Sequence, residues 1–184
     1  MLLVWGAIAL VAGATGAVAR SPVPPPAIVL GLILGGLLAY SLSTRVKAWV
    51  RAVSPRALVG IHLVRFVGAW FIVLYRRGEL PFAFAVPGGW GDIAAAATAV
   101  AILLGALPAR NPPRRAALAA WNAFGLADIL FVVTTAARFF FADAGQLAPL
   151  TRLPLSLLPT YFVPLIILCH IRIFGWLRET RRER

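Results

Sequence analysis

Six side chains that could bind protons or charged groups lie inside long apolar stretches of this 184-residue sequence. They are His62, Arg65, Asp92, Asn122, Asp128 and His170. Histidine and aspartate can exchange protons, and the guanidinium of arginine can hold a carboxylate. A charge at the centre of a bilayer costs about 2.5–3.5 kcal/mol on insertion scales. Such residues are therefore expected to face one another, or a water-filled cavity, inside a helix bundle.

The apolar stretches themselves predict membrane-spanning helices. A span needs about 20 mostly apolar residues to cross roughly 30 Å of hydrocarbon. Six spans are predicted, at residues 2–19, 27–42, 57–75, 90–107, 116–141 and 155–176. The chain is 61% hydrophobic and 13% charged, against about 25% charged in soluble domains. We therefore predict one all-α domain over residues 1–184, a bundle of six transmembrane helices.

The basic residues orient this predicted bundle. They cluster between spans two and three, between spans four and five, and after span six, and include Arg45, Lys47, Arg51, Arg56, Arg110, Arg114 and Arg115. The positive-inside rule then places both termini in the cytoplasm. These loops account for the net charge of +12, so the charge does not indicate a nucleic-acid partner. The abundance of arginine and alanine suggests a bacterial protein of the inner membrane, with the lipid bilayer as its main partner.

The stretch at residues 80–91 breaks the regular pattern, because it is apolar but contains two prolines and three glycines. We expect it to be an irregular outer segment before the fourth helix, either re-entrant or lying as a loop among the lipid headgroups. Asp92 follows directly, on the outer side. It is interpreted as a helix N-cap, where a carboxylate suits the helix dipole, with a place in a polar pathway as the alternative.

The remaining polar residues are predicted to form one buried cluster. His62, Asn122 and His170 each lie about six residues from the cytoplasmic end of a span, which corresponds to roughly 9 Å of depth. Arg65 follows His62 by one helical turn. Asn122 and Asp128 lie on one face of the fifth span. Pairing with Asp128 is the least costly way to bury Arg65.

Several roles for this cluster remain open. It could be purely structural, or it could line a path for a small solute, an ion or a proton. His62 and His170 could ligate one haem or another tetrapyrrole, because imidazole is a common axial ligand. No paired-carboxylate, zinc or nucleophile motif is present, so an enzyme is the less favoured class. Cys169 is the only cysteine and is interpreted as an apolar filler.

Two stretches carry a resemblance to known sequences. The first runs from Gly78 to Asp92 and includes Phe-Ala-Val-Pro-Gly-Gly-Trp-Gly-Asp, and the second is Pro-Thr-Tyr-Phe-Val-Pro-Leu at 159–165, leading to His170. Together they resemble a group of uncharacterised multi-span bacterial integral membrane proteins that have no assigned activity. The resemblance implies the membrane class and favours a shared role for Asp92, Asp128 and His170.

The sequence as a whole favours a transporter or channel for a small solute, an ion or a proton. The alternative is a non-catalytic accessory subunit of a larger membrane complex, which could bind a haem or other pigment through His62 and His170. In that case other membrane subunits, or further copies of the chain, would be partners. A water-filled cavity that reaches Asp128 would favour transport.

Overall fold

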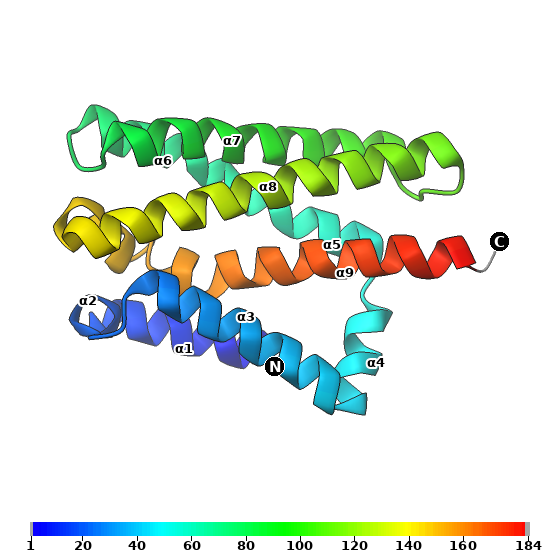
Figure 1. Cartoon of the computed structure of the whole chain (residues 1–184), viewed down its shortest axis with the longest axis horizontal. Coiled ribbons are helices and arrows are strands. Elements are labelled where there is room, and N and C mark those ends of the chain that lie inside the picture. Colours follow the sequence, from blue (N-terminus) through cyan, green and yellow to red (C-terminus); the bar gives the residue numbers. More distant parts are fainter. Residues whose placement is uncertain (1, 183–184) are drawn as a thin grey trace.

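The computed structural model describes residues 2–182, which are helical throughout with short connections and contain no strand. Arg184, one of the C-terminal arginines, lies outside this range. The long helices α3 (Pro25–Leu42), α7 (Phe82–Ala101), α8 (Pro112–Asp143) and α9 (Val163–Arg182) run along the longest axis of the molecule (Figure 1). The chain is therefore the all-α bundle that its composition predicts.

Five helical segments are long and apolar enough to cross a membrane. They are Pro25–Leu42, Pro55–Arg76, Phe82–Ala106, Pro112–Thr151 and Leu158–Thr180. The first predicted span, at 2–19, is instead the shorter helix α1 (Leu2–Ala14) followed by α2 (Ala17–Arg20). The helices α1 and α2 are separated at Gly16, whose φ of 70° lies in the left-handed region that glycine enters without steric cost. Trp5 links α1 to the segment before α9, because its Nε1 donates to the Thr160 carbonyl oxygen at 2.8 Å.

The prediction of an irregular segment at 80–91 was wrong, because residues 82–91 form the first half of α7. The helix begins at Phe82 after Pro81, and Pro87 lies inside it. A proline removes one backbone hydrogen bond, a loss that neighbouring helices can compensate in apolar surroundings. The glycines serve helix packing: a Cβ added at Gly89 would lie only 2.6 Å from the carbonyl oxygen of Gly68 on the neighbouring helix.

The third predicted span is not one uniform helix. It consists of α5 (Pro55–Gly60), the 3₁₀ helix η1 (Ile61–Val67) and α6 (Gly68–Arg76). A 3₁₀ stretch in the middle of a helix is uncommon and often marks a functional hinge. Two π-helical turns follow, η2 (Ile102–Ala106) after α7 and η4 (Leu158–Phe162) before α9. A further 3₁₀ segment, η3 (Ala144–Thr151), follows α8.

The basic connection between the second and third spans is itself a helix, α4 (Thr44–Ala52). The Ser43 side chain accepts a hydrogen bond from the backbone N–H of Val46 and so caps its start. This helix lies across the end of the bundle that also carries the C-terminus (Figure 1). Its three cations are Arg45, Lys47 and Arg51, and none of its residues is buried. Basic amphipathic helices of this kind lie in the plane of a membrane interface.

Two clusters of buried apolar side chains fill the bundle, one toward each end. On α8, Leu118 belongs to one cluster, whereas Ile129 and Val132 belong to the other. On α9, Ile166 belongs to the same cluster as Ile129, and Ile173 belongs to the same cluster as Leu118. On α8, Asn122 and Asp128 lie between members of the two clusters, and on α9, His170 follows directly after the point where one cluster gives way to the other. The fold thus surrounds a polar layer with apolar packing above and below it.

Candidate functional site

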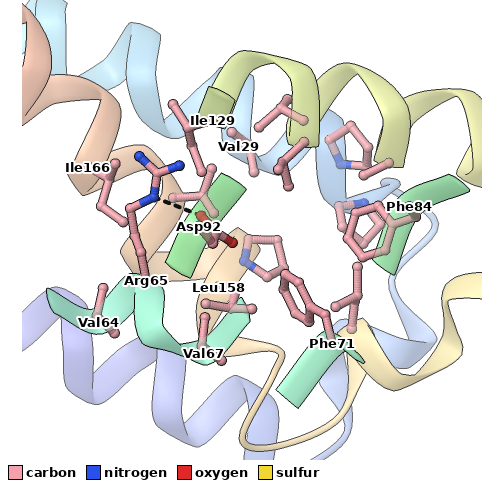
Figure 2. A pocket seen from close by; sticks show the side chains of 18 of the residues that line it. Val29, Val64, Arg65, Val67, Phe71, Phe84, Asp92, Ile129, Leu158 and Ile166 are labelled. Atoms are coloured by element: carbon pink, nitrogen blue, oxygen red, sulfur yellow. Dashed lines mark hydrogen bonds and ion pairs between the residues drawn. The ribbon is translucent and has the colours of Figure 1, made fainter. Parts of the chain in front are cut away.

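Arg65, on the 3₁₀ segment η1, is the centre of the polar layer and is 1% exposed. Its Nε donates to Asp92 Oδ1 on α7 at 2.7 Å, a bond drawn in Figure 2. Its Nη1 donates to the carbonyl oxygen of Gly125 on α8 at 2.9 Å. Its Nη2 forms an ion pair with Asp128 Oδ2, also on α8. One guanidinium therefore joins η1, α7 and α8.

The structure brings Arg65 and Asp128 together, as the sequence suggested, but adds a second carboxylate. Asp92 is 3% exposed and lies well inside α7 rather than at its start. The interpretation of Asp92 as a helix N-cap was therefore wrong. It failed because Phe82, and not Trp90, begins the helix, so Asp92 lies several turns deeper than its distance from the prolines indicated.

The close approach of α7 and α8 depends on a glycine beside this ion cluster. A Cβ at Gly91 would overlap the carboxylate of Asp128, so a larger residue there would push the carboxylate away from Arg65. Gly125 on α8 likewise leaves room for its neighbours, because a Cβ added there would lie 2.8 Å from His170 Cε1 and 3.3 Å from Arg65 Nη1. Small residues at these points allow charged side chains to meet between helices.

The formal charges in the cluster do not balance. A guanidinium stays protonated under all ordinary conditions, so Arg65 contributes one positive charge, and Asp92 and Asp128 contribute two negative charges when both are ionised. The sum is one negative charge among groups that are almost wholly buried. An uncompensated charge in a low-dielectric interior is unfavourable. One proton or one cation would bring the cluster to neutrality.

A second polar group adjoins the first. His170 on α9 faces Asn122 on α8, with 2.8 Å between Nδ1 and Oδ1, and Asn122 Nδ2 donates to the His170 carbonyl oxygen at 3.0 Å. Since the Asn122 amide nitrogen serves the carbonyl, its oxygen faces the ring and must accept from Nδ1–H. His170 Nε2 then carries a bare lone pair. It has no hydrogen-bond partner among the described residues.

His62 lies directly against His170, and the two ring centroids are 4.2 Å apart. The common depth predicted for His62, Asn122 and His170 corresponds to real proximity in the structure. Trp121 packs edge-on against His62 at 5.0 Å and donates its Nε1–H to the Ala95 carbonyl oxygen at 3.1 Å. Within the described chain neither ring nitrogen of His62 has a hydrogen-bond partner. From the sequence alone, Trp121 was assigned only to the membrane interface, and its contact with His62 was not predicted.

This arrangement does not fit a haem held between His62 and His170. Axial ligands must place their nitrogens on opposite faces of one iron, each at about 2 Å. The two rings instead contact each other directly, which leaves no slot for a tetrapyrrole between them. Among residues 2–182 there is also no group of three or more His, Cys, Asp or Glu side chains placed to hold a metal ion.

An apolar cavity reaches the ion cluster from the end of the bundle that contains η3 and the start of α3. Figure 2 shows its apolar side chains, among them Phe71, Phe84 and Leu158, with Arg65 and Asp92 to one side. The cavity has a volume of about 60 Å³. Arg65 and Asp92 line it, whereas Asp128 does not. The sequence could not reveal this cavity, because its walls come from segments between Pro25 and Ile166.

The fold and the site define a class: an all-helical chain with membrane-length apolar helices packed around a buried network of charged and polar side chains. The chain belongs to the family described as "Domain of unknown function (DUF8737)", whose model matches residues 23–178. The match begins just before α3, so α1 and α2 lie outside it. No curated protein and no solved structure matches the chain.

Proposed function

We propose that this chain is a multi-pass protein of the bacterial inner membrane, with both termini in the cytoplasm, that moves a small solute, an ion or a proton across the bilayer. The observation that carries the proposal is the ion cluster, in which Arg65 is bound to Asp92 and Asp128 deep inside the bundle. Ionisable residues within membrane-spanning helices are costly and are commonly found on transport pathways.

The backbone around the cluster supports the same role. Arg65 and His62 lie on the 3₁₀ segment η1, between two α-helical parts of one membrane-length stretch. Transporters commonly place their binding sites where spanning helices are interrupted. Two further stretches have a π-helical turn at one end, η2 at the end of Phe82–Ala106 and η4 at the start of Leu158–Thr180, and π-helical turns are frequent at functional sites.

A proton is the first candidate for the transported species. With both carboxylates ionised, the cluster carries one excess negative charge, which a single proton on either of them would remove. His170 Nε2 and both ring nitrogens of His62 lie nearby without hydrogen-bond partners in the described part of the chain. Imidazole nitrogens of this kind accept and pass protons. The adjacent carboxylates and imidazoles could therefore form one proton pathway across the polar layer.

The test measures proton flux through the purified protein. The wild type is reconstituted in liposomes that contain a pH-sensitive dye, and a potassium diffusion potential with valinomycin drives proton entry. We expect faster acidification than in empty liposomes, and a loss of most of that difference in Asp92→Asn. Asp143→Asn is the matched control, because Asp143 is an exposed carboxylate at the end of α8. Wild-type flux equal to that of empty liposomes would contradict proton transport.

The second candidate is an accessory subunit of a larger membrane complex, and the exposure of α3 favours it. Only 11% of the α3 stretch is buried, against 33% or more for the other four membrane-length stretches. Gly31 and Gly35 on α3 have no neighbouring atom within 4 Å of an added Cβ. A partner helix could lie on this surface. Absence of flux, together with a stable complex that Gly31→Leu disrupts, would support this role instead.

A further inference from the structure

The cavity beside Arg65 has the features of a binding site for an organic molecule. Of its lining residues, Arg65 and Asp92 alone are charged, and the others are proline or apolar side chains from α3, η1, α6, α7, α8, η3, η4 and α9. Figure 2 shows Asp92 between Arg65 and the apolar side chains that include Phe71 and Phe84. A ligand in this space would place its apolar part among these side chains and its polar part at Asp92.

Asp92 has one carboxylate oxygen to offer such a ligand. Its Oδ1 accepts from Arg65 Nε at 2.7 Å, and no described residue donates a hydrogen bond to Oδ2. The side chain is 5% exposed, and Oδ2 is not among the fully buried side-chain atoms that lack a partner. Oδ2 therefore keeps a small accessible surface at which a hydrogen-bond donor can approach it. The cavity therefore calls for a ligand with an N–H or O–H donor.

The charge of the cluster selects among such ligands. Arg65 already donates from all three of its nitrogens to protein acceptors, so it is poorly placed to receive an anion. The two carboxylates exceed the one guanidinium by one charge. No charged residue from α3, η3, η4 or α9 lines the cavity. A cation bound at Asp92 would neutralise the cluster, whereas an anion would add to its excess negative charge.

We propose that the cavity binds a small lipophilic primary amine in its ammonium form, with the nitrogen at Asp92 and the hydrocarbon part among the apolar walls. An ammonium group offers three donors and one positive charge, which matches the free carboxylate oxygen and the excess charge. The proposal rests on the proposed transport function in one respect: the amine is the solute, and a proton is its competitor for the same carboxylate. Binding itself does not depend on transport.

Binding is measured with n-hexylamine, and n-hexanol and hexanoate serve as probes of equal chain length. Isothermal titration calorimetry uses the wild-type protein in lipid nanodiscs, with the signal of empty nanodiscs subtracted. We expect hexylamine to bind at least about tenfold more tightly than hexanol, because a charged hydrogen bond replaces a neutral one. Hexanoate should show no binding. Equal affinity for hexylamine and hexanol would overturn the proposal.

Variants separate the carboxylate from the cavity. Asp92→Asn removes the excess charge and keeps the volume, so hexylamine affinity should fall about tenfold or more while hexanol affinity stays. Ala136 on α8 lines the cavity, so Ala136→Phe should fill it and abolish the binding of both ligands. Ala137 on the same helix does not line the cavity, so Ala137→Phe should leave the binding of both ligands unchanged. Far-UV circular dichroism and gel filtration confirm that each variant is folded. Unchanged hexylamine affinity in either Asp92→Asn or Ala136→Phe would overturn the proposal.

The two proposals fail in different ways. If hexylamine does not bind but proton flux remains and depends on Asp92, the substrate class is wrong and the transport function stands. If hexylamine binds at Asp92 but no proton flux is detected, the amine site is correct and proton transport is wrong. Measuring binding in nanodiscs and flux in liposomes with the same variants distinguishes these results.

Discussion

Replacing Arg65 by methionine should be among the most destabilising single changes in this protein. The substitution leaves Asp92 and Asp128 facing each other without a counter-ion and leaves the Gly125 carbonyl without its donor. The two carboxylate side chains are only 5% and 10% exposed. Removing one member of a buried ion pair costs about 3–5 kcal/mol. We expect Arg65→Met to lower the free energy of unfolding by at least that amount.

Replacing a carboxylate should have a much smaller effect than replacing the arginine. Asp92→Asn keeps an oxygen that can accept from Arg65 Nε and brings the formal charge of the cluster from −1 to 0. The loss of a charge-assisted bond is then offset by the removal of an unbalanced buried charge. We therefore expect a change of about 1 kcal/mol or less. In the Asp92→Asn background, Arg65→Met should also cost less than in the wild type, because it strands one carboxylate instead of two.

A double-mutant cycle measures this coupling. The protein is unfolded in mixed detergent micelles with increasing sodium dodecyl sulfate and followed by far-UV circular dichroism. Arg138→Met is the matched control, because Arg138 is an exposed arginine on α8, and its replacement should change stability by about 0.5 kcal/mol or less. The reasoning would be refuted by additive effects of Arg65→Met and Asp92→Asn, or by an Arg65→Met cost no greater than that of Arg138→Met.

Four further predictions follow from the packing, the hydrogen bonds and the charge distribution. Gly89→Ala should destabilise the bundle by about 1–3 kcal/mol in the same assay, because it forces α7 away from α6, whereas Gly31→Ala has free space and should not destabilise. Asn122→Ala should cost about 1–3 kcal/mol, because it leaves His170 Nδ1 without its partner and removes the side-chain donor of the His170 carbonyl oxygen. In intact cells, an impermeant thiol reagent should label a cysteine at Gly78 but not one at Ser54, in a cysteine-free background. The purified protein should show no absorption in the visible range.

The sequence predicted those parts of the fold that depend on composition. Long apolar runs located the membrane-length helices, and the pairing of Arg65 with Asp128 followed from the cost of burying either charge alone. The prediction failed where packing outweighed local preference. Pro87 was taken to interrupt a helix, but α7 continues through it, and the neighbouring glycines allow contact with α6.

The same error separated Asp92 from the predicted cluster of Arg65 and Asp128. Once the helix was assumed to start at Trp90, Asp92 fell in its first turn, where a carboxylate has a good local explanation. The 3₁₀ conformation of η1 and the cavity were also beyond prediction. Both depend on contacts among segments that are distant in sequence, and no local pattern of residue types encodes them.

The length of α8 has a consequence for the bilayer around the protein. Its 32 residues extend over about 48 Å, whereas the hydrocarbon core is only about 30 Å thick. A helix of this length must tilt, or extend into the headgroup region at its ends. Asp128 and Gly125 lie on this helix and contact Arg65 on another, so a change in tilt would shift them relative to η1. Membrane thickness could therefore act directly on the geometry of the ion cluster.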